Sequence, residues 1–337
     1  MSWPTFWSQT NWKTTLLSPL SRLVCWEARR RLNRFIQSPP PKKGKAVVIV
    51  VGNIVVGGSG KTPFIIWLVN KLQQQGLRVG IVSRGYGGKS ERWPQEVGAN
   101  SDPQQVGDEP VMLAKQLGCP VAVSPKRKEA IALLEHKYAP DVIISDDGLQ
   151  HYGMARDIEI VMVDAQRRFG NGYCLPAGPL REPASRLQQV DFIVYNGDLP
   201  KTIEYPQKSF AMQLQPVCFH RLSDYEETLP AEAFSGQTVN ALAGIGNPQR
   251  FFDTLSRLRI HVDGKAFADH HAYRASDFEG YGDEKPLLMT EKDAVKCSKF
   301  AQTGQKQNWW YLEVAPQADQ VLFDSLYDRV KSLRQAP

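Results

Sequence analysis

The chain has 337 residues, of which 42% are hydrophobic and 23% charged, a length that favours about two domains with sizeable cores. Its five cysteines are scattered and never form a C-x-x-C pair, which argues against a disulfide framework or a zinc site and for a reducing compartment. We find neither a signal-peptide pattern nor a run of about 18 apolar residues, so we expect a cytoplasmic chain that does not span a membrane.

The positive charge of the chain is concentrated in an N-terminal arm. Residues 1–45 have a net charge of +8, whereas the remaining 292 residues have a net charge of −2. A nucleic-acid enzyme would spread positive charge around its active site. We therefore expect no nucleic-acid partner.

The arm itself has the pattern of a basic amphipathic helix. Ser18 is the expected N-cap, with Pro19 at the first helical position, and the prolines at 39–41 end the helix. Apolar residues recur at helical spacing, most arginines lie elsewhere on the wheel, and tryptophans crowd the first dozen residues. This pattern predicts that residues 1–36 contact a membrane surface. The alternative is a helix packed on the protein's own core with solvated arginines.

The strongest motif follows the arm. Residues 47–51 are a run of valine and isoleucine typical of a buried parallel strand, and the sequence GGSGKT then leads into Pro63 and an amphipathic helix. This order predicts a nucleotide-phosphate site, although Val55 stands where the standard motif has glycine. Lys61 would reach the β- and γ-phosphates and Thr62 would ligate Mg²⁺. The phosphates would lie against the backbone of Gly57, Gly58, Ser59 and Gly60.

Further strands of the same sheet end in polar loops. Residues 78–83 form a strand that leads to Arg84 and Tyr86, at the sheet edge where open α/β folds bind ligands; the alternative for Arg84 is an ordinary surface arginine. Taken by itself, Asp108 is explained as an acidic residue in the first turn of a helix, where it complements the helix dipole. Arg127 follows the strand 120–124 and is either a phosphate ligand or solvated.

Two later segments also carry chemistry. The strand that begins at Asp141 ends in Asp146 and Asp147, which are suited to Mg²⁺ opposite the Lys-Thr pair. The Gly- and Pro-rich segment 170–183 includes Arg181 and Glu182 and has the composition of an ordered active-site loop. Strands at 158–163 and 190–196 complete the predicted sheet.

The C-terminal part alternates strands and helices again, which predicts a second, smaller α/β unit. The expected domains are the arm at 1–45, a phosphate-loop domain with a Rossmann-like parallel sheet at 46–200, and the smaller α/β domain at 201–337. In the last domain, His270 and His271 are compatible with zinc, with proton handling or substrate binding, or with a structural role. The sequence TEKD at 290–293 has the wrong spacing for a guanine-recognition motif.

Eight motifs, in one order, resemble the tetraacyldisaccharide 4′-kinase family: GGSGKTP, SRGYGG, VGDEP, DDGLQH, LPAGPLREP, AGIGNPxxFF, FADHHAY and TEKDA. The resemblance implies two Rossmann-like lobes and a peripheral enzyme on the cytoplasmic face of a Gram-negative inner membrane. It implies transfer of the γ-phosphate of ATP to the 4′-hydroxyl of the tetraacyldisaccharide 1-phosphate precursor of lipid A, with Mg²⁺. It implies no obligate protein partner.

The resemblance also assigns roles to residues. Asp108 and His270 would form an acid–histidine dyad that accepts the proton of the sugar hydroxyl. Catalytic cations would be Lys61, Arg127 and Arg181, and the metal ligands Thr62, Asp146, Asp147 and Glu182. The substrate would contact Arg84, Tyr86, Gln150, His151 and Asn196.

Two other functions remain open from the sequence. A phosphate-loop GTPase or metal-insertion chaperone has a similar glycine loop, but it needs a guanine-recognition motif and metal ligands that we do not find. A membrane-recruited scaffold switched by ATP would leave the pairing of Asp108 and His270 unexplained.

Overall fold

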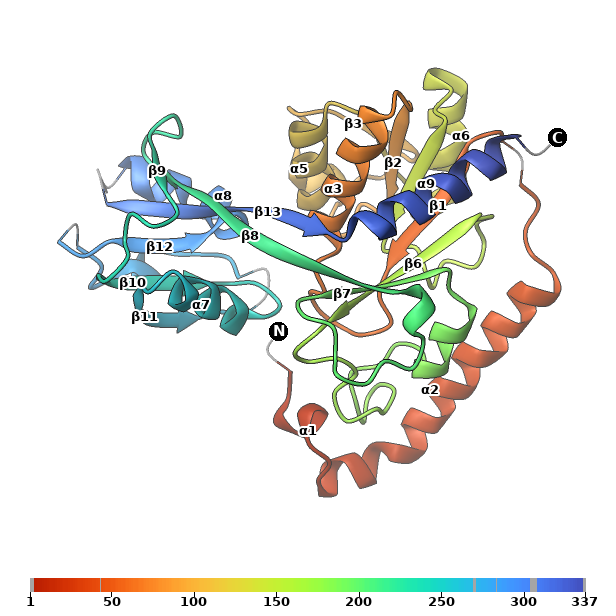
Figure 1. The fold of residues 1–337 in the computed structure, drawn as a ribbon, viewed down its shortest axis with the longest axis horizontal. Coiled ribbons are helices and arrows are strands. Elements are labelled where there is room, and N and C mark those ends of the chain that lie inside the picture. The colour runs from red at the N-terminus through yellow and green to blue at the C-terminus, as the bar shows by residue number, and fades with distance from the viewer. Residues whose placement is uncertain (1–2, 43, 269–270, 283, 304–307, 336–337) are drawn as a thin grey trace. The chain divides into compact units, whose positions relative to one another are not determined.

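The computed structural model describes residues 3–42, 44–268, 271–282, 284–303 and 308–335, and its elements are labelled in Figure 1. The chain divides into a larger unit, Pro4–Gln213 with the C-terminal residues from Pro316, and a smaller unit, Leu214–Ala315 with Trp3. We expected residues 201–337 in one C-terminal domain. The terminal helix instead belongs to the larger unit, where Phe323 meets the ring of Trp67 edge-on.

The larger unit is built on a mostly parallel sheet, which confirms the predicted fold class. The strand order is β8-β7-β6-β1-β5-β2-β4-β3, and of these pairs β3 with β4 is antiparallel. Its elements are α1 Thr5–Ser8, α2 Trp12–Gln37, β1 Val47–Gly52, α3 Lys61–Gln74, β2 Val79–Ser83, β3 Gln95–Val97, α4 Pro103–Val106, α5 Asp108–Leu117, β4 Val121–Val123, α6 Arg127–Tyr138, β5 Val142–Asp146, β6 Ile158–Asp164, η1 Ala184–Gln189, β7 Phe192–Asn196, η2 Pro206–Lys208, the first part of β8 Ser209–Arg221, and α9 Gln320–Gln335.

Strand β1 lies at the centre of this sheet and defines where a ligand binds. It pairs in parallel with β5 on one side and with β6 on the other, and all six of its residues are buried. The chain leaves β1 toward β2, beyond β5, and leaves β5 toward β6, beyond β1. Connections that depart in opposite directions leave a crevice at the carboxyl ends of the two strands.

Helix α2 is longer than the sequence analysis predicted. It begins at Trp12, where Asn11 and Thr14 form a capping box, so Pro19 lies inside the helix and Ser18 is not its cap. A proline has no N–H for the carbonyl four residues earlier. The Ser18 hydroxyl donates to that carbonyl, Thr15 O, at 2.9 Å, which explains why the helix tolerates Pro19.

The smaller unit has its own hydrophobic core, and its strands belong to the same hydrogen-bonded sheet as those of the larger unit. Strands β11, β10, β12 and β13 are parallel neighbours, β13 lies next to β8, and β9 is antiparallel to β8. The sequence did not predict β8, and the segment Ala275–Phe278 forms only a short 3₁₀ helix. Its elements are the later part of β8, β9 Thr228–Pro230, β10 Thr238–Ala243, α7 Pro248–Arg257, β11 His261–Ala266, η3 Ala275–Phe278, β12 Leu287–Thr290, α8 Glu291–Thr303 and β13 Trp309–Ala318.

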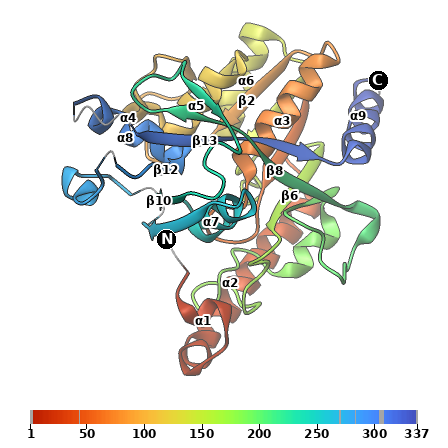
Figure 2. The same ribbon diagram turned by 60° about the vertical axis from the view of Figure 1, so that its left-hand side comes forward.

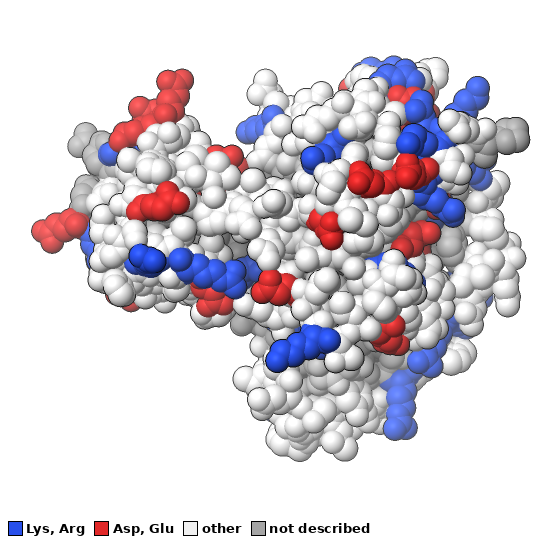
Figure 3. Space-filling model, in the orientation of Figure 1, with Lys and Arg blue, Asp and Glu red and all other residues white. Residues whose placement is uncertain are grey.

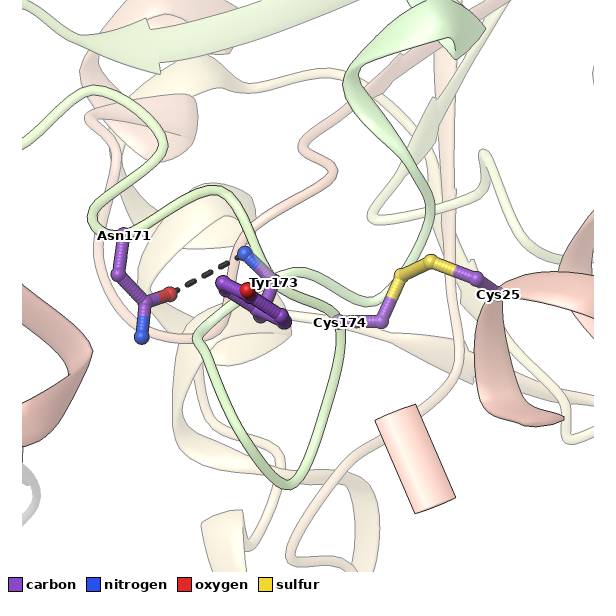
Figure 4. Close-up of a disulfide and its surroundings, with 4 residues drawn as sticks. All are labelled: Cys25, Asn171, Tyr173 and Cys174. Carbon is purple, nitrogen blue, oxygen red and sulfur yellow. Dashed lines mark hydrogen bonds between the residues drawn. A yellow bond between two sulfur atoms is a disulfide. The ribbon is translucent and has the colours of Figure 1, made fainter. Parts of the chain in front are cut away.

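A disulfide joins Cys25 of α2 to Cys174, as Figure 4 shows. We expected no disulfide framework because the cysteines are scattered, and that expectation is wrong for this pair. The two residues are 149 positions apart, a separation that carries no pairing signal in the sequence. The remaining cysteines, Cys119, Cys218 and Cys297, are free thiols.

Candidate active site

The glycine loop between β1 and α3 has the backbone that a phosphate cradle needs. Gly57 and Gly60 have positive φ, at 101° and 88°, and Gly60 caps the N-terminus of α3. The buried side-chain amide of Asn53 donates to Gly57 O and to Ser59 Oγ, both at 3.1 Å. These hydrogen bonds fix the shape of the loop, and the positive end of the α3 dipole lies where the loop enters the helix.

Three charged side chains converge beside this loop. Lys61 Nζ lies 3.4 Å from Asp147 Oδ1, and Arg181 donates to Asp147 Oδ2 at 3.0 Å. Burial alone would raise the pKa of Asp147, but Lys61 and Arg181 lower the pKa to about 2. Asp147 is therefore an anion between two cations at neutral pH. Two cations and one anion leave the cluster positive and suited to a polyanion.

Asp146 has a different environment from its neighbour. Burial and the Glu109 carboxylate raise its pKa above the ordinary range of a carboxyl group. The Arg127 guanidinium donates to the backbone carbonyls of Asp146 and Asp147 at 3.0 and 2.9 Å. Arg127 is nearly fully buried, and no hydrogen-bond partner of its Nε lies among the described residues. Its hydrogen bonds therefore fix the backbone of the acidic pair.

The segment 170–183 packs directly on the loop between β1 and α3. Val56 N donates to Pro179 O at 2.9 Å, and Arg181 N donates to Ile54 O at 2.8 Å. Helix α1 supports the other side of the segment, because Trp7 Nε1 donates to Pro176 O at 3.0 Å and Asn171 Nδ2 donates to Phe6 O at 2.7 Å. The N-terminal arm therefore helps to place Arg181.

Glu182 lies in a buried network rather than in open space. It accepts hydrogen bonds from Gln150 Nε2, at 3.1 Å, and from the Tyr152 hydroxyl. Arg186 lies 3.7 Å from it and also contacts Glu159 at 2.6 Å. Sequence reasoning missed Tyr152 and Arg186. The spacing of four between Glu182 and Arg186 was the available signal.

Two neighbouring loops carry residues expected to act on the acceptor. Arg84 and Tyr86 are exposed, and Asp108 is exposed at the first turn of α5. A Cβ on Gly107 would approach Tyr86 O to 2.6 Å, so the two loops touch. Burial and the nearby Arg127 lower the pKa of His151 to about 4, which keeps this imidazole neutral at pH 7.

Other expected residues have different positions from those we anticipated. Asn196 is buried beneath the phosphate loop and donates to Ser59 O at 3.3 Å, so it braces the loop rather than facing the sugar. His270 lies outside the described residues. His271 stacks on Phe267 and contacts Asp277 Oδ2 at 2.9 Å, which favours the structural alternative for this residue.

The fold and the loop define the class of the protein. A mostly parallel α/β sheet with a glycine loop before a helix, and with acidic residues after the adjacent strand, is typical of proteins that bind nucleotide phosphates. A sequence profile of the family "Tetraacyldisaccharide-1-P 4'-kinase" matches residues 13–331. The chain belongs to the tetraacyldisaccharide 4′-kinase family, as its motifs predicted, and it is a kinase.

Individual relatives agree along nearly the whole chain. The tetraacyldisaccharide 4'-kinase of Hydrogenovibrio crunogenus is 60% identical over 319 residues, covering 94% of each chain. That of Alcanivorax borkumensis is 47% identical over 314 residues, covering 93% of this chain and 92% of the relative. The crystal structure of "apo" form LpxK from Aquifex aeolicus in complex with ATP superimposes with a TM-score of 0.73 and 28% identity, covering 95% of this chain and 99% of that one.

Proposed function

We propose that this kinase transfers the γ-phosphate of ATP to the 4′-hydroxyl of the tetraacyldisaccharide 1-phosphate precursor of lipid A. The observation that carries the proposal is the convergence of Lys61, Arg181 and Asp147 beside the glycine loop. The activity for which the relatives are named supports the acceptor, and the ATP bound to the Aquifex aeolicus protein supports the donor.

The residues of this chain have distinct roles in phosphoryl transfer. The backbone N–H groups of the glycine loop and the N-terminus of α3 hold the phosphates. Lys61 and Arg181 neutralise the charge that shifts onto the transferring oxygens. Arg127 fixes the backbone of the acidic pair, and Asn53 and Asn196 fix the loop. Most of the rate enhancement in such transfers comes from positioning and charge.

The acidic pair fits Mg²⁺. Asp147 Oδ1 is a buried oxygen that accepts no hydrogen bond from the described residues, although Lys61 Nζ lies 3.4 Å away. The hydroxyl of Thr62 and the carboxylate of Asp146 are oxygen donors of the kind that Mg²⁺ takes. When bound, Mg²⁺ supplies positive charge that neutralises the phosphate oxygens. Glu182 accepts hydrogen bonds from Gln150 and Tyr152, and in this proposal its carboxylate supports the Mg²⁺ site.

Asp108 is the proton acceptor in this proposal, with His270 as its partner. A sugar hydroxyl must lose its proton as it attacks, and an exposed carboxylate at a rim lined by Arg84 and Tyr86 is suited to accept it. Because His271 has structural partners in Phe267 and Asp277, the assignment of the dyad histidine goes to His270.

Guanine specificity is disfavoured by the environment of Asp293. This carboxylate, in the TEKD motif, is fully buried and accepts hydrogen bonds from Gly244 N, Thr290 Oγ1 and Tyr273 OH. A carboxylate that reads guanine must face the base. The partners of Asp293 therefore support ATP over GTP as the phosphoryl donor.

Helix α2 supports a peripheral association with the cytoplasmic face of the inner membrane. Large apolar side chains on it are more than half exposed: Trp12, Leu16, Leu20, Leu23 and Trp26. At about 100° per residue they share one face, opposite the buried side chains of Thr14, Ser21 and Leu32. An apolar face turned outward, among arginines, suits a lipid surface. None of the described helices is long and apolar enough to cross a membrane.

The test is a phosphotransfer assay with radiolabelled ATP and the tetraacyldisaccharide 1-phosphate in detergent micelles, run beside GTP. We expect a labelled lipid product with ATP, its loss in Lys61→Ala, and a turnover lower by roughly 10²–10⁴-fold in Asp108→Ala with ATP affinity retained. Equal rates with GTP, or an Asp108→Ala enzyme within a few-fold of wild type, would overturn the donor or the proton acceptor respectively.

A further inference from the structure

A cluster in the smaller unit, outside the candidate active site, brings together three metal-binding side chains. Cys218 and His220 lie on β8, and Glu313 lies on the neighbouring strand β13. Cys218 Sγ is 3.2 Å from His220 Nε2 and 3.3 Å from Glu313 Oε2, and these two atoms are 2.7 Å apart. A sulfur, a nitrogen and an oxygen atom that can each bind a metal ion therefore lie next to one another.

The strand geometry explains why the three side chains meet. Residues two apart on a strand share a face, so Cys218 and His220 point the same way, while Phe219 between them is buried in the core with Trp310 and Leu312. On β13, Glu313 shares its face with Tyr311, whose ring stacks on His220 at 4.8 Å. Regular alternation on two neighbouring strands builds the cluster without any special loop.

The second nitrogen of His220 fixes the orientation of the ring. Nδ1 lies 3.1 Å from the carbonyl oxygen of Tyr225, which accepts a hydrogen bond and so keeps the proton on Nδ1. The lone pair of a neutral imidazole is then on Nε2 and faces Sγ and Oε2. A backbone carbonyl on the outer nitrogen is the usual support of a metal-ligating histidine.

The arrangement is unlike a nucleophilic cysteine site. In such a site the thiol and the carboxylate bind different nitrogens of the imidazole, so that the ring passes a proton between them. Here both groups face the same Nε2. Two atoms with lone pairs, Nε2 and Oε2, are within hydrogen-bond distance, so a positive species lies between them: a proton on His220 or a metal ion.

We propose that Cys218, His220 and Glu313 bind a zinc ion. Sulfur, nitrogen and oxygen ligands together are typical of zinc, whereas Mg²⁺ prefers oxygen ligands alone. Ligand atoms around a tetrahedral zinc lie roughly 3.3–3.6 Å apart, so the cluster needs only a small expansion. The side chains of His220 and Glu313 are 18% and 43% exposed, which leaves room for water as the fourth ligand. Binding releases the thiol proton of Cys218 to solvent.

The proposed zinc site is independent of the proposed kinase function, and the test uses Co²⁺ as the probe. Full-length, tag-free protein is reduced and titrated with Co²⁺, because a thiolate ligand gives a sulfur-to-cobalt charge-transfer band that an all-oxygen site cannot give. We expect one equivalent of Co²⁺ to produce the band and one equivalent of Zn²⁺ to remove it. The band is lost in Cys218→Ser and is retained in Cys119→Ser, which alters another free thiol.

A second variant guards against a folding defect. Glu313→Gln changes a partly exposed side chain, so the fold is kept, and we expect at least a roughly 10-fold weaker Co²⁺ affinity, about 1.4 kcal/mol. The absence of a band in wild type would mean that the positive species is a proton on His220. A band that persists in Cys218→Ser, or an unchanged affinity in Glu313→Gln, would place the metal elsewhere. Each of these outcomes overturns the proposal.

Discussion

Gly60 stands where the phosphate loop turns into α3, and two physical constraints act on it. Its φ of 88° lies in the left-handed region, which costs an L-residue about 1–2 kcal/mol. A Cβ at this position would also overlap the side-chain amide of Asn196, which braces the loop. Gly76 has a similar φ of 77°, but a Cβ there would meet no atom of the described residues within 4 Å. Comparing substitutions at Gly60 and Gly76 therefore separates the effect of backbone strain from that of steric overlap.

We predict that Gly60→Ala weakens ATP binding by roughly 10-fold or more, about 1.4 kcal/mol, because the loop must move away from Asn196. Gly76→Ala has the same kind of backbone strain and should lose about 1–2 kcal/mol of stability with ATP affinity unchanged. Isothermal titration with ATP and urea unfolding of both variants measure the two effects. If the two variants bind ATP alike, the support of the loop by Asn196 is not needed for binding.

Glu159 and Asp141 offer a second matched pair, since each carboxylate serves two arginines. Glu159 contacts Arg156 and Arg186, whose side chains are 3% and 1% exposed. Asp141 contacts Arg78 and Arg334, whose side chains are 64% and 39% exposed. Solvent therefore screens the charges around Asp141 but not those around Glu159.

We predict that Glu159→Gln lowers the free energy of unfolding by about 3–5 kcal/mol, because the buried Arg156 then loses its carboxylate partner and the buried Arg186 keeps only Glu182, at 3.7 Å. Asp141→Asn should cost less than about 1 kcal/mol. Urea unfolding followed by circular dichroism gives both values. Similar costs for the two variants would show that burial of the Glu159 cluster does not govern its strength.

Single side chains were the hardest level to predict from the sequence. Lys61 and the Asp146–Asp147 pair were assigned to the candidate site because a strand and a loop of known geometry surround them. Asn196 was expected at the sugar because it ends a strand, as ligand-binding residues do. The sequence gives no measure of how closely the phosphate loop packs on that strand end, so its role as a brace depended on the three-dimensional structure.

Among the elements, the disulfide between α2 and the segment 170–183 is the least expected connection. It closes a loop of 149 residues. We predict that reduction, or Cys25→Ser, lowers the free energy of unfolding by about 2–4 kcal/mol, because the unfolded chain regains conformational freedom. The measurement is urea unfolding with and without dithiothreitol.

Two controls accompany the disulfide prediction. Cys119→Ser should retain the response to dithiothreitol, whereas Cys25→Ser should lose it. Thiol titration in denaturant should count three free thiols before reduction and five after it, as the free Cys119, Cys218 and Cys297 require. Five thiols before reduction would contradict the bond itself.

Elements with strong local signals were predicted well. The buried strands β1, β5 and β6 are rich in valine and isoleucine, so length and composition identified them. Strand β8 was missed because its sequence contains Pro216, which argues against a strand, and because it has no long apolar run. The start of α2 was misplaced because a proline is preferred at a first turn, and the Ser18 hydroxyl that compensates inside the helix is visible only in the structure.

At the scale of the whole molecule, helix α2 presents both exposed apolar side chains and exposed arginines. Figures 1 and 2 show α2 as a long helix along the outside of the larger unit, and Figure 3 shows Lys and Arg side chains on this edge beside uncharged surface. The first half of the helix presents the exposed Leu16, Leu20 and Leu23, and the second half presents exposed arginines such as Arg30 and Arg34. Both features favour an anionic lipid surface.

We predict that the triple variant Leu16→Gln, Leu20→Gln and Leu23→Gln binds anionic vesicles at least roughly 100-fold more weakly, because each leucine contributes on the order of 1 kcal/mol or more when buried in lipid. The three side chains are exposed, so the fold should be unaffected. Co-sedimentation with vesicles measures the partition. Val217→Gln with Val321→Gln removes exposed apolar side chains elsewhere and should have no effect; undiminished binding of the triple variant would exclude this face.

The hydrogen bonds from Trp7 to Pro176 and from Asn171 to Phe6 have a practical consequence for protein engineering. Removing the arm to obtain a better-behaved enzyme for inhibitor screening would also remove the support beneath Arg181. Such a truncated enzyme would lose activity even in detergent, where no bilayer is required. Exchanging the outward leucines while keeping helix α1 is therefore the safer route to a reagent that reports on the catalytic centre alone.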